Sequence, residues 1–385
     1  MSDLPSLLDD VCDEHGIPGA VALVARGEAV EVASTGRRAV DGAPMTRDTV
    51  FRIASLTKPI IAAAAMVLVD RGRLGLDDPV ADLLPELAAP SVLVDVRGPV
   101  DDPDNRVPAE RPITLRDLLT FGAGHGLPAE YDAPVVARLV EELAQGPLQP
   151  ATMPEPEEWM RRLAGLPLLH QPGRGWTYNT GADVLGVLLA RAGGAPLGDV
   201  LAETVLEPCG MTDTGFWTED TERLATYYRR DGSELVLADP PDGQWAAPPP
   251  FASGAGGLLS TVDDLWAFGR MLLAGGEHRT GRQLRRVLAA ESVRLMTTAH
   301  VVDPHPFLDG QGWGFGGGVD VTRDHPWNVP GRYGWVGSSG TAAYVVPATG
   351  TVVVWLSQVQ LGGAAETAAM AEVLTYAAGA SGSQG

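Results

Sequence analysis

The chain has 385 residues, of which 45% are apolar and 20% charged, so it can build a large core like an ordinary globular protein. Its formal net charge of −21 disfavours nucleic acid and anionic membranes as partners, because phosphate binding requires a positive surface. We find no signal peptide, no apolar run of membrane-spanning length and only two cysteines, which have neither metal nor disulfide spacing. We therefore expect a cytoplasmic protein.

The two ends of the chain predict the strands of one sheet. A short helix from Leu4 to Glu14 is followed by two strands, residues 19–27 and 28–36, which turn sharply where they meet. At the other end, residues 340–358 predict a second hairpin, and residues 364–378 predict a last helix. Strands from both ends of the chain can pair in the same sheet, which leaves the middle of the chain as an insertion.

The middle of the chain predicts helices. Apolar residues recur at helical spacing, with a glycine or proline stop, in four segments: 134–146, 156–165, 181–194 and 198–210. The predicted fold class is therefore α/β (α+β). Its antiparallel sheet is built from about residues 18–35 and 310–358, with flanking helices and an inserted helical part.

The expected domain organisation is a single catalytic unit over residues 1–385. Its sheet part covers about 1–75 plus 245–380, and its mainly helical part covers about 76–244. We expect the active site in the cleft between these two parts, because clefts between packed units are common binding sites.

Ser55 and Lys58 form an S-x-x-K motif at the start of an apolar helix. Lys58 is the only lysine, and the other 27 basic residues are arginine. Residues i and i+3 share one face of a helix, and Pro59 requires this helix to begin near Ser55. A serine hydroxyl needs a base to become a nucleophile, and a desolvated lysine can be that base, whereas arginine stays protonated. The alternative is a structural lysine whose stem packs in the core.

With this motif in place, the chain resembles the serine β-lactamase and penicillin-binding-protein superfamily. The branch it is most similar to is the class C-like group often called family VIII carboxylesterases. The resemblance extends over five segments: 51–85, 113–128, 172–194, 253–276 and 331–358. It implies a β-lactamase/D,D-peptidase-like fold and an acyl-enzyme, with Ser55 as nucleophile and Lys58 as its base. We expect no cofactor.

A second family motif, Y-x-N, is present in altered form. The chain has Tyr178, Asn179 and Thr180 in sequence, one residue shorter than the usual spacing. Alignment from the preceding Pro-Gly makes Tyr178 the second proton-transfer group that the resemblance implies. Alignment from Gly181 would place Thr177 there instead, and threonine cannot act as a phenolate. The alternatives are that Tyr178 is a core tyrosine and that Asn179 only caps a helix. Whether Asn179 or Thr180 takes the asparagine role stays open.

The third family motif departs from the pattern of the β-lactamases. Those enzymes and the D,D-peptidases usually carry K-T-G, whose cation binds the substrate carboxylate. This chain has no second lysine, and Trp335 to Gly337 is similar to the W-x-G of the esterase branch. We expect Trp335 to present an apolar wall, unless Arg332 supplies the cation. The resemblance also implies an oxyanion hole of the Ser55 and Ser338 backbone N–H groups. The alternative is a glycine-rich turn.

Other hydrolase classes are disfavoured. No serine lies in G-x-S-x-G, and the seven histidines show no metal-ligand pattern, so we expect no metal. Three functions remain. The first is a carboxylesterase on small apolar acyl esters with at most weak β-lactamase activity, and the second is an acyltransferase or thioesterase of a biosynthetic pathway; both have a small-molecule acyl substrate as partner. The third is a catalytically silent binding or scaffold relative. Ser55, Lys58 and Tyr178 argue against the third. The sequence does not separate the first two, nor does it indicate an oligomeric state.

Overall fold

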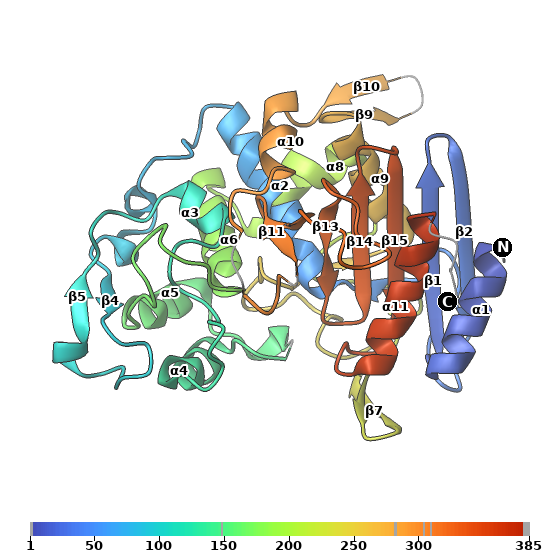
Figure 1. The fold of residues 1–385 in the computed structure, drawn as a ribbon, viewed down its shortest axis with the longest axis horizontal. Helices are drawn as coiled ribbons and strands as arrows, with labels where there is room; N and C mark the ends of the chain where they lie inside the picture. The colour runs from blue at the N-terminus through green and yellow to red at the C-terminus, as the bar shows by residue number, and fades with distance from the viewer. Residues whose placement is uncertain (1–2, 148, 281–282, 303–304, 309, 380–385) are drawn as a thin grey trace.

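A computed structural model of the protein describes residues 3–147, 149–280, 283–302, 305–308 and 310–379. Its centre is an antiparallel sheet of seven strands in the order β11-β12-β13-β14-β15-β1-β2 (Figure 1). Strands from the two ends of the chain pair directly, because β1 lies beside β15 with Ala20 opposite Ser357 and Arg26 opposite Thr351. The strands are β1 (Gly19–Arg26), β2 (Ala29–Gly36), β11 (Gln311–Trp313), β12 (Gly318–Asp320), β13 (Tyr333–Gly337), β14 (Thr341–Val346) and β15 (Thr351–Ser357).

Helices cover both faces of this sheet. On one face, α1 (Leu4–His15) and α11 (Ala364–Ala377) share a core with the β1 residues Ala20, Ala22 and Val24. On the other face, Val21 and Leu23 belong to the main core, which also contains α9 (Val262–Leu273) and α2 (Thr57–Asp70). The central strands are apolar at nearly every position because successive side chains point to opposite faces and both faces are covered.

The remaining helices gather mainly on one side of the sheet, where α3, α4, α5 and α6 lie together (Figure 1). Their bounds are α3 (Leu115–Leu119), α4 (Pro134–Leu143), α5 (Pro156–Ala164), α6 (Thr180–Gly193), α7 (Leu197–Leu201), a π-helix (Ala202–Leu206), α8 (Glu207–Cys209) and α10 (Ala290–Met296). Short 3-10 helices lie at Ala54–Leu56, Val80–Asp82, Pro85–Leu87, Pro103–Asn105 and Pro150–Thr152. Four two-stranded ladders complete the fold: β3 (Phe51–Arg52) with β8 (Leu259–Ser260), β4 (Ser91–Leu93) with β5 (Arg106–Pro108), β6 (Tyr227–Asp231) with β7 (Glu234–Asp239), and β9 (Glu277–Thr280) with β10 (Gln283–Arg286).

The predicted fold class is confirmed: an antiparallel sheet made from both ends of the chain is flanked by helices. Among the elements that were not predicted is the β6–β7 hairpin inside the helical middle. Its Tyr228 exchanges backbone hydrogen bonds with residues 358 and 360, next to β15. Part of the segment 76–244 therefore contacts the sheet, and the proposed boundaries of the two parts stay a prediction.

The helices were also tested for the length and apolarity that a membrane span needs. Across the described ranges, no single helix meets both conditions. The pair formed by α6 and residues 197–209 passes by length and composition, but it is bent by 80°.

Candidate active site

Ser55 lies in the single 3-10 turn that leads into α2. The preceding strand β3 is held by pairing with β8, and the turn Ala54–Leu56 continues directly into the helix at Thr57. Ala54 has a φ of 45°, a left-handed conformation that a residue with a Cβ rarely adopts. Such strain persists only where the surroundings enforce it, and it is common beside catalytic groups. The chain thus presents Ser55 at a helix start, where the dipole favours negative charge.

Lys58 is one turn further along, inside the core. Its side chain is 1% exposed, and its Nζ lies 2.7 Å from Ser55 Oγ and also hydrogen-bonds the carbonyl of Ala255. Burial lowers the pKa of Lys58 to about 7, while the charge of Asp183 opposes that shift. A neutral amine can donate to Ala255 and accept from the serine hydroxyl at once. The S-x-x-K spacing therefore places a potential base directly on Ser55.

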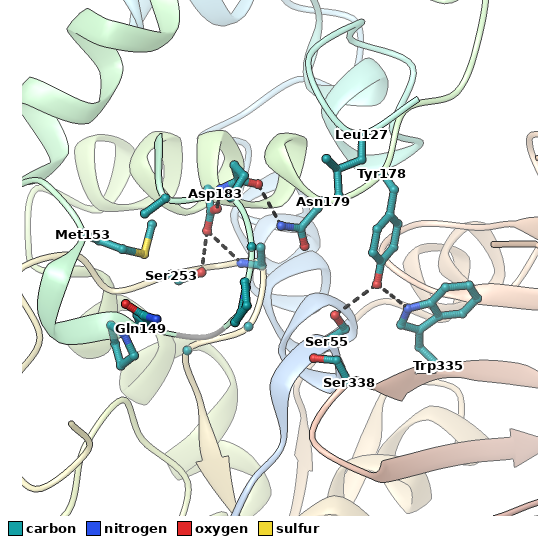
Figure 2. A pocket seen from close by; sticks show the side chains of 18 of the residues that line it. Ser55, Leu127, Gln149, Met153, Tyr178, Asn179, Asp183, Ser253, Trp335 and Ser338 are labelled. Carbon is teal, nitrogen blue, oxygen red and sulfur yellow. Dashed lines mark hydrogen bonds between the residues drawn. The ribbon is translucent and has the colours of Figure 1, made fainter. Parts of the chain in front are cut away.

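Tyr178 approaches Ser55 from the other side. Its backbone exchanges two hydrogen bonds with Leu127, and its Oη donates to Ser55 Oγ at 3.0 Å (Figure 2). The Nε1 of Trp335 donates to the same Oη at 2.7 Å, which leaves the phenol hydrogen for the serine. Burial raises the pKa of Tyr178 to about 12, although both hydrogen bonds work against that rise. Tyr178 is therefore a neutral proton donor and Lys58 the more available base.

Trp335 and Ser338 reach the site from β13 and the turn after it. Trp335 is 3% exposed and lines the cavity beside Ser55, but it is also a hydrogen-bond donor to Tyr178 and so more than the apolar wall we expected. Gly318 on β12 leaves room for this indole, because a Cβ there would come within 2.8 Å of the ring. In the described part of the chain, the backbone N–H groups of Ser55 and Ser338 have no protein acceptor. Both residues line the cavity, and Gly337 ends β13 just before the second one.

Asn179 follows Tyr178 into the cavity and begins a buried polar network. Its Nδ2 donates to Gln145 Oε1 at 2.8 Å, and Gln145 Nε2 donates to Asp183 at 2.8 Å (Figure 2). Asp183 also accepts from Ser253 Oγ at 2.6 Å and from the N–H of Ala255 at 3.0 Å. Because all three of these partners donate, Asp183 is the ionised acceptor, even though burial raises its pKa. The network ends at Ala255, whose carbonyl binds Lys58.

The altered Y-x-N motif can now be placed. Tyr178 is at Ser55, whereas Thr177 is buried and donates to the carbonyl of His125. Asn179 is the N-cap of α6, but its side chain makes no capping bond and lines the cavity instead. Thr180 is fully buried, and its hydroxyl donates to Gln145. The geometry thus favours Asn179 over Thr180 for the asparagine position.

Charge is nearly absent from the cavity. Its volume is about 340 Å³, and among the described residues that line it Asp183 is the only charged one. Arg332 does not line it: the guanidinium binds Asp320 with contacts of 2.7 and 3.2 Å and stacks on Tyr344. The Arg332 guanidinium is therefore paired with Asp320 and does not replace the substrate-binding cation of K-T-G in this cavity.

Several cavity residues were missed by sequence reasoning. The main ones are Gln145, Met153, Asp183, Trp245 and Phe307. Asp183 could have been found from the sequence, because it lies four residues after Asn179 and so on the same face of α6. The others come from loops and helix ends with no spacing that relates them to Ser55.

One group in the described ranges has the atom types of a metal site. Glu14, His15 and Glu372 bring their ligand atoms within 4.8 Å of one another. Glu14 and His15 end α1, and Glu372 lies within α11, on the face of the sheet that does not contain α2. His15 is bonded to Glu372 at 2.8 Å, and this cluster has no connection to Ser55.

Comparisons with known proteins relate the chain to beta-lactamases and esterases. The family model described as beta-lactamase matches residues 4–377. Protein Rv1367c of Mycobacterium tuberculosis is 40% identical over 366 residues, which cover 91% of this chain and 88% of that protein. Esterase EstB of Burkholderia gladioli is 35% identical over 291 residues, covering 68% and 67%. Among solved structures, EstCE1, a hydrolase with promiscuous acyltransferase activity, has 27% identity and a TM-score of 0.77, covering 96% of this chain and 97% of that one.

Proposed function

The chain belongs to the beta-lactamase family, a family of serine hydrolases, and from this premise we propose that it is a carboxylesterase. Its substrates are small, uncharged, apolar acyl esters, and it acts through an acyl-enzyme on Ser55. β-Lactam hydrolysis is weak at most. No cofactor takes part, and the acyl ester is its principal partner.

The observation that carries this proposal is the absence of a cation from the described cavity lining, where Trp335 is the residue that the resemblance aligns with the K-T-G motif. A carboxylate placed against an indole would lose its hydration and gain no ionic partner. The one charged lining residue, Asp183, is itself negative and would repel it. A neutral ester carries no charge that would lose its hydration or be repelled by Asp183.

The mechanism starts with proton transfer from Ser55 Oγ to neutral Lys58, 2.7 Å away. The oxygen attacks the ester carbonyl, and the resulting oxyanion is held by the N–H groups of Ser55 and Ser338. Tyr178 then donates its proton to the departing alcohol, and the resulting phenolate takes the proton that Lys58 received from Ser55, since the Lys58 amine lies over the Tyr178 ring. The products of this half-reaction are the free alcohol and an acyl-Ser55 ester.

The second half-reaction repeats these roles with water. Neutral Lys58 is again the base: as water attacks the acyl carbon, its proton passes by way of the Tyr178 hydroxyl to Lys58, and the collapse of the tetrahedral intermediate returns that proton to Ser55 Oγ. The carboxylic acid leaves, and the site is restored.

The test compares p-nitrophenyl butyrate with a carboxylate-bearing cephalosporin. We expect kcat/KM for the ester to exceed that for the cephalosporin by about a hundredfold or more, since an unpaired buried charge costs several kcal/mol. Mass spectrometry of quenched enzyme should show one butyryl group, on the peptide that contains Ser55. Ser55→Ala should lose both the adduct and turnover. Faster cephalosporin turnover would contradict the esterase assignment.

Acyl transfer is the second candidate, because the same acyl-enzyme serves when an alcohol or thiol replaces water. EstCE1 is described as a hydrolase with promiscuous acyltransferase activity, which makes this candidate relevant here. The measurement is the ratio of new ester to free acid when an alcohol is added to the acyl-enzyme. A binding or scaffold role without catalysis would instead predict no adduct on Ser55 with any ester or thioester.

A further inference from the structure

The cavity has two sides, and the position of Tyr178 decides which part of the substrate each side receives. We propose that the leaving alcohol, or an acceptor alcohol, occupies a distinct aromatic subsite walled by Phe307, Tyr178 and Trp335, and that this subsite takes aryl or arylalkyl alcohols. The inference rests on the proposed function of Ser55.

Proton donation fixes the place of the leaving oxygen. That oxygen must come within about 3 Å of the group that protonates it. Lys58 is 1% exposed and does not line the cavity, whereas Tyr178 does and already contacts Ser55 Oγ. The leaving oxygen therefore lies beside Tyr178 Oη, and the alcohol extends along the Tyr178 side.

Aromatic rings form the wall on that side. The ring centroid of Phe307 is 4.6 Å from that of Tyr178, and Trp335 is 6.0 Å from Tyr178. Phe307 is 36% exposed although it is large and apolar, and Tyr131 supports it edge-on at 5.6 Å. A ring left half-open to the cavity can gain area and edge-to-face contacts from an aromatic ligand.

The opposite side of Ser55 has a different character. Figure 2 shows Ser55 between Tyr178 and Trp335 on one side and Met153 and Gln149 on the other. The residues of 144–147 and 149–153 that line this second side are aliphatic, thioether, proline, glycine and amide groups, and the polar network of Asn179 and Asp183 borders it. Trp245 also lines the cavity, next to Gln244, which bonds Ala151, but its indole is fully buried. The acyl chain, which must point away from the leaving alcohol, extends there.

The same subsite binds acceptors, because transfer to an alcohol is the reverse of acylation. An aryl alcohol enters beside Tyr178, gives its proton to the Tyr178–Lys58 pair and attacks the acyl carbon. The bond to Ser55 Oγ breaks, and the serine oxygen takes the proton back. Aryl alcohols should thus compete with water for the acyl-enzyme better than ethanol does.

The experiment uses two esters of one acid, benzyl butyrate and ethyl butyrate, so that the butyryl-enzyme is identical. Phe307→Ala should lower kcat/KM for benzyl butyrate about tenfold and change that for ethyl butyrate less than about threefold. Phe307→Leu, which keeps apolar bulk, should fall between. The control Leu237→Ala removes an exposed apolar side chain from β7 and should change neither value.

A second readout is the partition of the butyryl-enzyme between water and added benzyl alcohol. Phe307→Ala should lower the ratio of benzyl butyrate formed to butyrate released by a similar factor. Equal losses on both esters, or no loss on benzyl butyrate, would overturn the subsite while Ser55 is still acylated. Absence of acylation by either ester in the wild-type protein would instead overturn the proposed function, and the subsite with it.

Discussion

The catalytic groups and the cavity walls are built in different ways. Ser55 and Lys58 are carried by a turn and helix in the main core, Trp335 by the central sheet, and each polar group has a partner. The walls come from irregular segments, residues 144–147, 149–153 and 305–308, where apolar side chains lie partly open to the cavity. Rigid elements hold reacting groups to fractions of an ångström, whereas loops tolerate change. The comparison predicts that substitutions in the first region abolish chemistry and that those in the second redirect specificity.

The largest effect should follow Lys58→Arg. It retains a positive charge but cannot accept a proton, so we expect kcat/KM on p-nitrophenyl butyrate to fall by about a thousandfold or more. Arg97→Lys, an exchange of the same two residue types at an exposed position, is the matched control and should change nothing. Retention of most activity by Lys58→Arg would break the comparison, since the lone lysine would then have no role as a base.

Tyr178→Phe should have the next largest effect. It keeps the ring that contacts Phe307 but removes the proton donor and leaves the indole N–H of Trp335 unpaired. We expect kcat to fall about a hundredfold with little change in KM, because the loss concerns proton transfer. Tyr376→Phe removes a phenol oxygen far from the cavity and serves as control. A change confined to KM would assign Tyr178 to binding instead.

The pH profile connects the two regions through Asp183. Lys58 acts as a base only when neutral, so kcat/KM should rise with pH through an apparent pKa of about 7. Asp183 stabilises the protonated amine, so Asp183→Asn should lower that pKa and move the acid limb to lower pH. Asp132→Asn, at an exposed site, should leave the profile unchanged.

Asp183→Asn should also lower the stability of the fold. An asparagine amide at position 183 would face at least one of the three donors, so Asp183→Asn should reduce the free energy of unfolding by about 2 kcal/mol. A variant that loses stability but keeps the wild-type acid limb would show that Asp183 is structural only.

The smallest effect belongs to the acyl side of the cavity. Met153→Ala enlarges the space opposite Tyr178, and we expect kcat/KM to change less than about tenfold, with a relative gain for longer acyl chains. Measuring acetyl, butyryl and octanoyl p-nitrophenyl esters gives the profile. An equal loss on all three would mean that Met153 supports the fold rather than the acyl group.

The sequence predicted the catalytic groups, which lie on regular helices and strands, and missed most of the cavity walls, which lie on irregular segments. S-x-x-K follows from helix geometry, the terminal hairpins from apolar runs with turn residues, and Tyr178 from its motif. Gln145 and Phe307 reach the cavity because segments far apart in the chain contact one another, and no residue spacing within a single segment predicts such contacts. The β6–β7 hairpin was missed because its strands are short and lie within a part of the chain predicted to be helical.

The burial of Lys58 has a practical consequence for labelling experiments. It is the only side-chain amine of the protein and is 1% exposed, so the folded side chains offer no amine to reagents such as succinimidyl esters. Acylation of Lys58 by such a reagent requires α2 to separate from its surroundings, which is a local opening event. In Ser55→Ala, where ester acylation of the serine cannot contribute, one mass increment on Lys58 would therefore count the molecules in which this helix has opened.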